Sequence, residues 1–391
     1  MSFSMPEVAY LRAHHTDITT HLATLDLTPR TTITDAQYLR THFGDYGRAV
    51  MELGRARHTT RTKLPPDWLM CHESAQQATP MPVADIRAAR IRRLFGPTAV
   101  AHDVTCSIGT EGHAIHAAGL TYIGSDIDPA RVAMARHNLG PQPALYAADA
   151  LRPATTHPAD VIIADPARRQ AGRRITNPEH LLPPLSQLTT TYPHTPMAIK
   201  CAPGLDFHDW DGLVSLVSVD GGVKEACLYS PTLADNQRRE AVIIRTGQPT
   251  RVITDQGPDD IPEGPPGTYI IDPDGAIVRA GLVRHYGYNE NLWMLDHRIA
   301  YLTGAAIPAG TSGFRYRETV PLKKLKSALH AHDCAAVEIL VRGVDIDPDQ
   351  LRKKLRLTGA QPLTIVCTRI GRSGVALICG PRESAPQPSK D

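Results

Sequence analysis

The feature that most constrains the fold is a series of four short apolar segments between residues 101 and 169, each followed by an acidic residue. The first reads A-H-D-V-T-C-S-I-G-T-E-G over residues 101–112, and the second reads Y-I-G-S-D-I-D-P over 122–129. The third, A-L-Y-A-A-D-A, reaches Asp149, and the fourth, D-V-I-I-A-D-P-A-R-R, contains Asp165. Open α/β sheets bind ligands at the carboxyl ends of their strands, so this spacing predicts a parallel sheet with a polar site along one edge.

The first loop indicates which cofactor such a site would take. A dinucleotide fold needs the spacing G-x-G-x-x-G, which lets a helix N-terminus hold a pyrophosphate. This loop has only Gly109 and Gly112, with Asp103 and Glu111 beside them. Carboxylates repel phosphate and attract an ammonium group. The loop therefore favours a cofactor with an amino-acid head, a ribose and an adenine but no phosphate, which is S-adenosylmethionine.

On these residues, the region 99–200 resembles the class I methyltransferase fold. D-V-T-C-S-I-G-T-E-G is similar to the methionine-binding motif of that family, S-D-I-D-P-A to its ribose-binding strand end, and A-A-D-A to its adenine-edge motif. D-P-A-R-R resembles its catalytic Asp-Pro loop. Q-Q-A-T-P at residues 76–80, K-C-A-P-G at 200–204 and the tail with V-C-T-R-I-G resemble a bacterial subfamily with a THUMP-like C-terminal domain. The resemblance implies a Rossmann-like, seven-stranded methyltransferase sheet and binding of S-adenosylmethionine.

Each acid has an expected role at its strand end. Asp103 is placed to reach the ammonium group directly or through the following loop amides, and Gly109 lets the backbone approach the ligand without a Cβ. Asp126 is placed to accept both ribose hydroxyls, while Asp128 before a proline is expected to cap the helix over 130–138. Asp149 is placed to accept from the adenine amino group. The expected cofactor-binding residues are Asp103, Thr105, Cys106, Gly109, Asp126, Ile127, Asp128, Asp149, Ala150 and Asp165.

The expected catalytic residues are Asp165, Pro166 and Arg168. In enzymes that methylate an exocyclic amine, an Asp/Asn-Pro-Pro-aromatic loop grips the amino group, and positioning supplies most of the rate. This chain keeps Asp-Pro but has Ala167 and Arg168 where the second proline and the stacking ring would be. Arg168 and Arg169 are expected to bind a substrate phosphate, and Lys200 to contact the substrate or the loop.

Cys201 offers a second mechanism. Uracil-C5 RNA methyltransferases have a similar D-P-A-R loop and a nucleophilic cysteine after the next strand. Cys201 follows the expected fifth strand, and Lys200 beside it would lower the pKa of its thiol. The next residue is Ala202 where that family has asparagine, so a buried strand-end cysteine is the simpler interpretation.

Composition and patterning divide the rest of the chain. We expect a mainly helical region over 1–95, with helices over 39–53 and 83–94, and the methyltransferase domain over 96–246. Two segments, 223–230 and 240–245, are expected to pair antiparallel as its last strands. Residues 247–267 are rich in Pro and Gly and suggest a linker. We expect residues 268–380 to form a small α+β, THUMP-like domain and residues 381–391 to be a disordered tail.

Overall composition sets the remaining limits. The formal net charge is +2, so affinity for nucleic acid must come from local basic patches. The seven cysteines form no C-x-x-C pair, which suggests reduced thiols without zinc or another metal site. With neither a signal peptide at the start nor an apolar run long enough to span a bilayer, we expect a cytoplasmic protein without membrane contact.

The acceptor is the least constrained part of the function. The Arg168–Arg169 pair, the basic segments at 323–326 and 352–356 and the resemblance of the tail point to structured RNA, tRNA or rRNA. The basic segment of the helix over 83–94 is either an RNA contact or a solvated helix face. Methylation of a protein or a small molecule, and RNA binding without turnover, are the alternatives.

Overall fold

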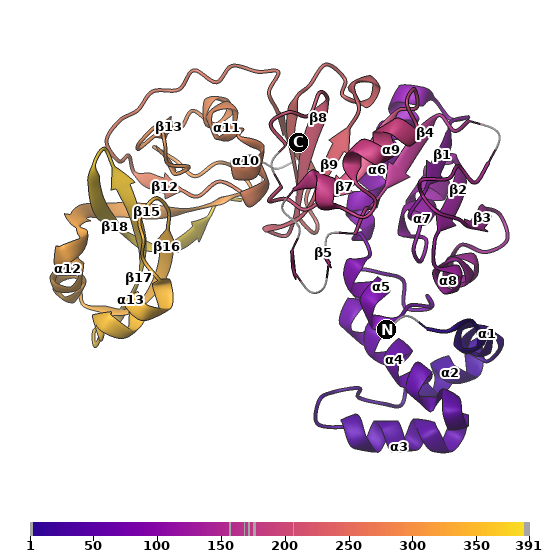
Figure 1. The fold of residues 1–391 in the computed structure, drawn as a ribbon. Helices are drawn as coiled ribbons and strands as arrows, with labels where there is room; N and C mark the ends of the chain where they lie inside the picture. The colour runs from indigo at the N-terminus through magenta and orange to yellow at the C-terminus, as the bar shows by residue number, and fades with distance from the viewer. Residues whose placement is uncertain are drawn as a thin grey trace. The chain divides into compact units, whose positions relative to one another are not determined.

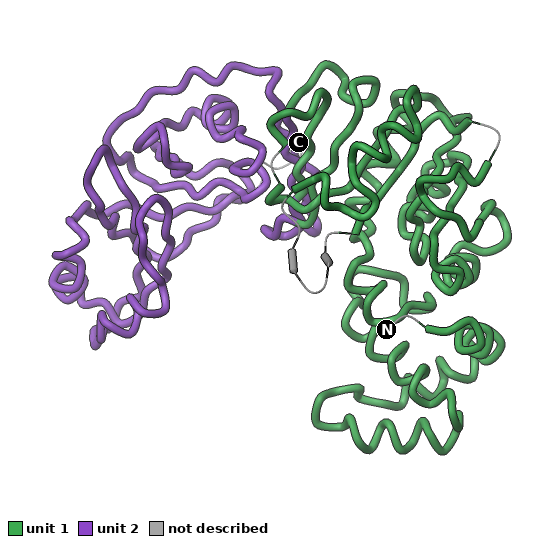
Figure 2. The backbone as a smooth tube through the Cα atoms, viewed as in Figure 1, with its two compact units in different colours: residues 1–217, 224–238 green, residues 218–223, 239–391 purple. Residues whose placement is uncertain are grey.

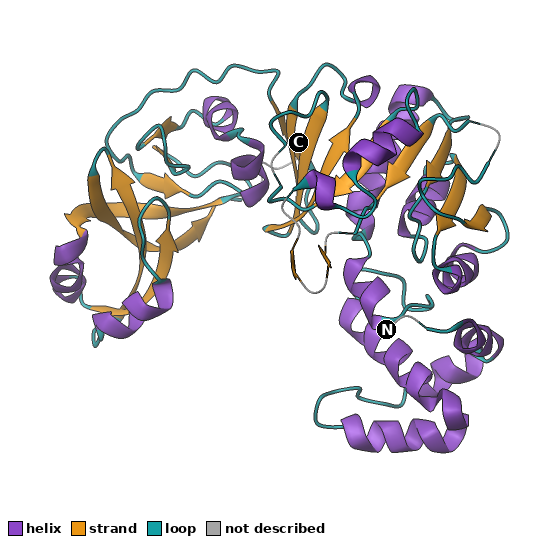
Figure 3. Ribbon diagram, viewed as in Figure 1, coloured by secondary structure: helices purple, strands orange, loops and turns teal. Residues whose placement is uncertain are grey.

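The structure, a computed structural model, describes residues 3–155, 158–167, 169–170, 173–174, 177–205 and 207–386, with 169–170 and 173–174 described by their backbone alone. Chain contacts divide it into two compact units (Figure 2). Unit 1 comprises residues 1–217 and 224–238, and unit 2 comprises 218–223 and 239–391. The predicted α/β class is confirmed (Figure 3).

Unit 1 begins with helices and continues as a sheet with flanking helices (Figure 1). Its helices are α1 (Met5–Ala13), α2 (His15–Leu22), α3 (Thr32–Phe43), η1 (Gly44–Tyr46), α4 (Gly47–Thr60), α5 (His72–Gln77), α6 (Met81–Phe95), α7 (Thr110–Ala117), α8 (Pro129–Leu139), η2 (Pro178–His180), α9 (Leu185–Thr191) and η3 (Pro231–Leu233). Its strands are β1 (Val100–Asp103), β2 (Thr121–Asp126), β3 (Ala144–Ala147), β4 (Val161–Ala164), β5 (Arg169–Gln170), β6 (Arg173–Arg174), β7 (Met197–Cys201), β8 (Leu213–Val219) and β9 (Gly222–Tyr229).

The main sheet of unit 1 has the strand order β8-β9-β7-β4-β1-β2-β3. From β3 to β7 the neighbouring strands are parallel, and β9 runs antiparallel to β7. The strands after β1 lie on one side of it as far as β3, and then on its other side from β4 onward. The loops after β1 and β4 therefore diverge and leave space at the carboxyl edge of the sheet. Alternate strand residues and the apolar faces of α6, α7 and α8 fill the core beneath this edge.

The four apolar segments and the expected fifth strand are confirmed as β1, β2, β3, β4 and β7, but the last two strands differ from prediction. The neighbours of β9 are β7 and β8, so the expected pairing of 223–230 with 240–245 is wrong. The hairpin partner is β8, joined to β9 by a two-residue turn in which Asp220 and Gly221 both have positive φ. Asp-Gly between apolar runs favours this turn, and the sequence contained that signal.

The N-terminal helices form part of unit 1 and share a core with it. Their buried residues cluster with Ile108, Ala130 and Met134 of the sheet region. Asn138 of α8 bridges the two parts: its Oδ1 accepts from the Leu69 N–H at 2.7 Å, and its Nδ2 donates to the carbonyls of Leu69 and Ile108 at 3.0 and 2.9 Å. The position of residues 69–80 is thereby fixed relative to the loop after β1.

The helix predicted over 39–53 is interrupted, which corrects that prediction. Gly44 has a φ of +55°, and a Cβ on Gly47 would lie 2.9 Å from the backbone of Arg40. The two glycines allow a sharp turn, so the chain forms α3, η1 and α4 in place of one helix. The helix predicted over 83–94 is confirmed as α6.

Unit 2 is an α+β unit. It contains β10 (Arg239–Ile244), β11 (Arg251–Thr254), β12 (Tyr269–Ile271), α10 (Gly275–Ala280), α11 (Val283–Asn289), β13 (Trp293–Met294), β14 (Leu302–Gly304), β15 (Ser312–Pro321), η4 (Leu322–Lys324), α12 (Leu325–Ala331), β16 (Cys334–Val341), α13 (Pro348–Leu355), β17 (Gln361–Ile370) and β18 (Ser373–Ser384). One sheet has the order β13-β14-β12-β15-β18-β17-β16, and α12 and α13 both contact β16. Two features differ from expectation: β11 lies within 247–267, and β18 continues to Ser384, within the expected tail.

We expect Asn138→Ala to lower the free energy of unfolding by about 2–4 kcal/mol, because it removes three hydrogen bonds and leaves partly buried backbone groups unpaired. Urea denaturation would measure the change. Gln37→Ala, at an exposed position on α3, is the matched control and should change stability by less than about 0.5 kcal/mol. A loss for Asn138→Ala as small as that of the control would show that this bridge does not hold the helices to the sheet.

Candidate active site

A cavity of about 430 Å³ lies at the carboxyl edge of the unit 1 sheet. Of the predicted site residues, those that line it are Asp103, Thr105, Cys106, Asp126, Ile127, Asp149, Ala150, Asp165 and Lys200. The cavity lining also includes residues that we had not assigned to the site: Gln77, Ala78, Thr79, Val104, Ser107, Ile108, Thr110, Glu111, Arg131, Ala167, Leu182 and Pro183. The four strand ends therefore meet in one space.

Backbone hydrogen bonds fix Asp126 at the end of β2. Its Oδ2 accepts from the Ser107 N–H at 2.9 Å and its Oδ1 from the Asp128 N–H at 2.9 Å. Burial raises the pKa of Asp126 above its usual value, although these two hydrogen bonds act to lower it. A carboxylate oxygen accepts more than one hydrogen bond, so each oxygen keeps capacity for a ligand hydroxyl.

Asp128 has the capping role that we expected. Its Oδ1 accepts from the Ala130 N–H at 2.8 Å at the start of α8, and Asp128 does not line the cavity. Beside it, the Ile127 side chain is 74% exposed and lines the cavity, so it presents an apolar surface next to the Asp126 carboxylate.

Asp103 lies deep in the wall, with 2% of its surface exposed. Its Oδ1 accepts from the Thr105 N–H at 3.1 Å, and its Oδ2 accepts from the Tyr122 hydroxyl at 3.3 Å. Burial and the nearby Glu111 carboxylate raise the pKa of Asp103 to about 7, although Lys200 acts in the opposite direction. Asp103 is therefore a carboxyl group that changes charge near neutral pH.

Lys200 pairs with Asp165, the acid of the expected catalytic loop. Its Nζ lies 2.8 Å from Asp165 Oδ2 and 3.5 Å from Glu111 Oε1. Burial lowers the pKa of Lys200, but Asp165 and Glu111 more than offset this and raise it above its usual value. Lys200 is thus a cation committed to two carboxylates, and of the two contacts that we expected for it, substrate or loop, the structure contains the one to the loop.

Glu111 is the site residue that the sequence reasoning left unassigned. It belongs to the first turn of α7, is 4% exposed, and lies 3.4 Å from Arg87 Nε through its Oε2. Within the described residues neither Glu111 oxygen has a hydrogen-bond partner, because the contacts to Arg87 and Lys200 lack hydrogen-bond geometry. In the sequence, Glu111 lies beside the glycine turn. Its position in the first turn of the helix that begins at this loop was the signal that could have identified it.

The basic segment of α6 has two buried and two exposed arginines. Arg87 is 1% exposed and forms a buried ion pair with Glu225. Arg90 is 8% exposed, donates to the Leu233 carbonyl at 3.1 Å and stacks over the Tyr229 ring. Neither of these two is an RNA contact or part of a solvated face, whereas Arg92 and Arg93 are exposed and keep both alternatives.

The expected catalytic loop lies partly within the described residues. The Asp165 N–H donates to Thr105 Oγ1 at 2.6 Å, which ties the loop to the end of β1. Pro166 is buried, and Ala167 forms a bridge with Leu182, whose carbonyl accepts the Ala167 N–H at 2.8 Å. Arg168 lies outside the described residues and the side chain of Arg169 is not described, so their substrate-binding role stays a prediction.

Two further predicted residues lie away from the cavity. Gly109 has a φ of +93° and a Cβ there would lie 2.9 Å from Leu139, so this glycine serves the turn and the packing of α8. Cys201 is fully buried in β7 and does not line the cavity. The seven cysteines are buried and in no disulfide, and the described residues contain no cluster of three or more metal-ligating side chains.

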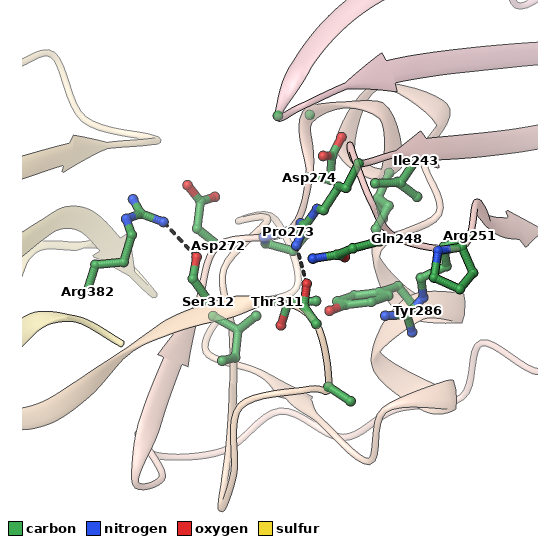
Figure 4. Close-up of a pocket in the computed structure, with 18 of the residues that line it drawn as sticks. Ile243, Gln248, Arg251, Asp272, Pro273, Asp274, Tyr286, Thr311, Ser312 and Arg382 are labelled. Atoms are coloured by element: carbon green, nitrogen blue, oxygen red, sulfur yellow. Dashed lines mark hydrogen bonds between the residues drawn. The ribbon is translucent and has the colours of Figure 1, made fainter. Parts of the chain in front are cut away.

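A second cavity, of about 360 Å³, lies within unit 2 (Figure 4). Arg382 donates to Ser312 Oγ at 2.9 Å across it, and Arg251 stacks over the Tyr286 ring. Three of its four arginines also form ion pairs with carboxylates: Arg251 with Glu290, Arg342 with Asp272 and Arg382 with Glu338. Most charges in this second cavity are therefore paired, whereas acids outnumber cations in the wall of the cavity at the carboxyl edge of unit 1.

The strand order and the acids at the strand ends define the class: a doubly wound α/β protein with an acidic cavity at the carboxyl edge of its sheet. Among proteins of known name, S-adenosylmethionine-dependent methyltransferases from two strains of Mycobacterium tuberculosis are 44% identical over 366 residues, covering 88% of this chain and 99% of theirs. The chain belongs to the family of S-adenosylmethionine-dependent methyltransferases.

Two other comparisons agree with this assignment. Residues 311–381 match the family model described as THUMP domain-like. The crystal structure of a proposed methyltransferase from Porphyromonas gingivalis W83 has the same fold, with a TM-score of 0.71 at 18% identity, covering 97% of this chain and 99% of that one. Within the described residues, no helix is both long enough and apolar enough to cross a membrane.

The pKa of Asp103 leads to a pH prediction for cofactor binding. A cationic ligand near Asp103 favours the ionised carboxylate, so a protonated Asp103 must release its proton as the ligand binds. We expect affinity for S-adenosylmethionine to rise between about pH 6 and about pH 7.5. Calorimetry near pH 6.5 in two buffers of different ionisation enthalpy would measure the released proton.

Asp103→Asn is the control for this prediction, because it cannot release a proton. We expect its affinity to be lower and nearly independent of pH over the same interval. Equal proton release by wild type and Asp103→Asn would contradict the assignment and would place the titrating group elsewhere.

Proposed function

We propose that the cavity at the carboxyl edge of unit 1 holds S-adenosylmethionine and that this enzyme methylates structured RNA next to Asp165. The observation that supports the cofactor site is the excess of carboxylates in the cavity wall. Five acids line it, namely Asp103, Glu111, Asp126, Asp149 and Asp165, against two cations, Arg131 and Lys200.

The charges of the cofactor fit this wall. S-adenosylmethionine carries an ammonium and a sulfonium, both cationic, against one carboxylate. A buried carboxylate without a hydrogen-bond partner is costly, and the two Glu111 oxygens are in this state. Binding of a cationic ligand beside Glu111 and Asp103 would reduce the repulsion among the acids.

The residues at the ends of β2 and β3 fit the nucleoside half. Asp126 keeps capacity at both oxygens for the two ribose hydroxyls, and Ile127 offers an apolar face to the adenine ring. Asp149 lines the cavity after β3, and its Oδ1 already accepts the Leu151 N–H at 3.0 Å. The remaining capacity of Asp149 is placed for the adenine amino group.

Methyl transfer next to Asp165 depends chiefly on positioning. When bound, the cofactor supplies an electrophilic methyl group on sulfur. Lys200 and the Thr105 hydroxyl fix Asp165, whose carboxylate would accept a hydrogen bond from an acceptor amino group and orient the nitrogen lone pair. The Ala167–Leu182 bridge keeps the loop beside the cavity.

The alternative, addition of a Cys201 thiolate to a pyrimidine, has less support. Cys201 is 0% exposed and is absent from the cavity lining, so a base at Asp165 would not reach its sulfur. An Asp165-centred mechanism therefore fits the site better than C5 methylation.

The proposal of RNA as acceptor rests on unit 2. The match to a THUMP-like family covers 311–381, and within it α12 and α13 pack on the same strand, β16. Exposed cations on and beside these helices are Lys323, Lys324, Lys326, Arg352, Lys353, Lys354 and Arg356. Clustered cations release counterions from a nucleic-acid backbone and bind it in a salt-dependent way.

Two substitutions should separate cofactor binding from catalysis. We expect Asp126→Ala to weaken S-adenosylmethionine binding at least about tenfold, because it removes two hydrogen bonds to the ribose. Asp165→Ala should keep the affinity within about threefold and lower the rate of transfer at least about a hundredfold, because it removes the oxygen that orients the acceptor amino group. Calorimetry and single-turnover transfer would measure the two effects. Full turnover by Asp165→Ala would rule out the proposed catalytic loop.

The acceptor would be found with labelled cofactor. The purified protein is incubated with tritiated S-adenosylmethionine and with separate pools of tRNA, rRNA, DNA and protein from a strain without this gene. We expect label in one RNA pool.

The role of the basic helices is tested by a double substitution. Lys353→Gln/Lys354→Gln should bind that RNA about tenfold more weakly near 0.15 M salt and show a shallower salt dependence. Arg61→Gln/Lys224→Gln, at exposed positions of unit 1, is the charge-matched control. Label found only in protein, or in none of the pools, would exclude RNA as the acceptor.

A further inference from the structure

Beside the Asp165 carboxylate, the cavity wall of unit 1 has an apolar surface whose side chains have no role above. Ala167, Leu182 and Pro183 all line the cavity. Ala167 is exposed, Pro183 is half-buried and Leu182 is 48% exposed, so each presents accessible apolar surface. A single exposed leucine needs no explanation, but three neighbouring apolar side chains in the wall of an acidic cavity indicate a binding surface.

Backbone pairing sets this surface next to Asp165. The Ala167 N–H donates to the Leu182 carbonyl at 2.8 Å, and the Leu182 N–H donates to the Ala167 carbonyl at 3.3 Å. Residues directly opposite in such an antiparallel bridge have their Cβ atoms about 5 Å apart on one face. Asp165 and Ala167 line the cavity, whereas Pro166 between them is buried, which is the alternation of an extended segment. The carboxylate and the apolar surface therefore share one face, about 7 Å apart along the backbone.

The segment that carries Leu182 is held on both sides. Before it, Leu181 is fully buried. After it, α9 leads to Tyr192, whose buried hydroxyl donates to the Ala150 carbonyl at 2.9 Å. Ala150 lines the same cavity, so α9 ties the segment to the loop after β3. The apolar surface is thus a fixed part of the wall, and a ligand would not have to order it.

The cofactor roles proposed above leave this surface available to the acceptor. The residues that face the cofactor belong to β1, β2, β3 and α7 or to the loops after these strands. The apolar surface lies instead on the loop after β4 and on the segment before α9, next to the carboxylate that receives the acceptor amino group. We therefore expect the chemical group that carries the acceptor nitrogen to lie against Ala167, Leu182 and Pro183.

The chemistry of this surface favours a planar base. The exocyclic amino group of adenine, cytosine or guanine lies at the edge of its ring, so a base whose amino group donates to Asp165 extends its ring over the neighbouring surface. The flat face of a base packs well on apolar side chains. An aliphatic amine is cationic at neutral pH, which removes the lone pair needed for transfer, and it has no flat face to cover the surface.

We propose that Ala167, Leu182 and Pro183 form the platform on which the acceptor base lies while its amino group donates to Asp165. This inference rests on the proposed function, and it specifies the acceptor as the exocyclic amine of a planar base. Leu182 is the largest of the three side chains and contributes most of the contact. The platform fixes the plane of the ring, so that the nitrogen is presented to the methyl group.

Leu182→Ser tests the platform, because it removes the apolar side chain and keeps the backbone hydrogen bonds of the bridge. Steady-state transfer would use tritiated S-adenosylmethionine and the RNA pool that wild type labels. We expect the KM for that RNA to rise about tenfold and kcat to stay within about threefold, since apolar contact with the bound base is lost. The Kd for S-adenosylhomocysteine in calorimetry and the melting temperature should stay close to those of wild type. Leu182→Met, which keeps an apolar side chain, should restore the KM.

Two other exposed isoleucines of unit 1 provide the matched controls. Ile127→Ser removes the apolar surface that is proposed to face the adenine, so it should raise the Kd for S-adenosylhomocysteine without raising the KM for RNA at saturating cofactor. Ile33→Ser, on α3, changes a side chain that is 72% exposed and does not line the cavity, so it should change neither constant. The Leu182 and Ile127 variants should therefore respond in opposite assays.

Four results would overturn the platform. A wild-type KM for RNA in Leu182→Ser would show that this side chain does not contact the acceptor. A loss of S-adenosylhomocysteine affinity as large as that of Ile127→Ser would place Leu182 against the cofactor. Methylation of a ribose hydroxyl, identified after nucleoside digestion, would keep RNA as the acceptor and contradict the platform. Label in protein alone would contradict the proposed function as well as the platform.

Discussion

The arrangement of unit 1 depends on one buried ionic network beneath the Asp165–Pro166 loop. Arg87 of α6 contacts Glu225 of β9 and Glu111 of α7, and Lys200 of β7 contacts Glu111 and Asp165. Breaking a buried pair by removing one partner is strongly destabilising, because it leaves an uncompensated charge. The network therefore fixes two helices, two strands and the Asp-Pro loop relative to one another, and it leaves negative charge directed at the cavity.

Much of this could be predicted from the sequence, because strand ends carry a local signal. The apolar runs ending at Asp103, Asp126 and Asp165 located the site edge, and Asp128 before Pro129 located the start of α8. These features depend on neighbours within a few residues, so a pattern of apolar and polar residues suffices to find them.

The parts that were missed depend on contacts between distant residues. The segment 83–94 was correctly predicted as a helix, but its arginines looked exposed because the partners of Arg87 and Arg90 lie more than a hundred residues away. Thr79 was missed for the same reason, since the N-terminal helices reach the cavity only through tertiary packing such as the Asn138 bridge. Glu111 was noticed beside the glycine turn but was given no role, because its contacts with Arg87 and Lys200 are tertiary as well. The loop contact expected for Lys200 is present as its pair with Asp165, but the second carboxylate was not anticipated.

The central claim is that unpaired carboxylate oxygens in the cavity wall attract the cationic amino-acid end of the cofactor. The most direct test is the affinity of Glu111→Gln for S-adenosylmethionine, together with its melting temperature without ligand. In this variant Arg87 keeps Glu225 and Lys200 keeps Asp165, so we expect a folded protein, with a melting temperature lowered by the loss of the Glu111 charge from the network. The account predicts that its affinity falls about tenfold or more. Wild-type affinity in a folded Glu111→Gln protein would contradict it.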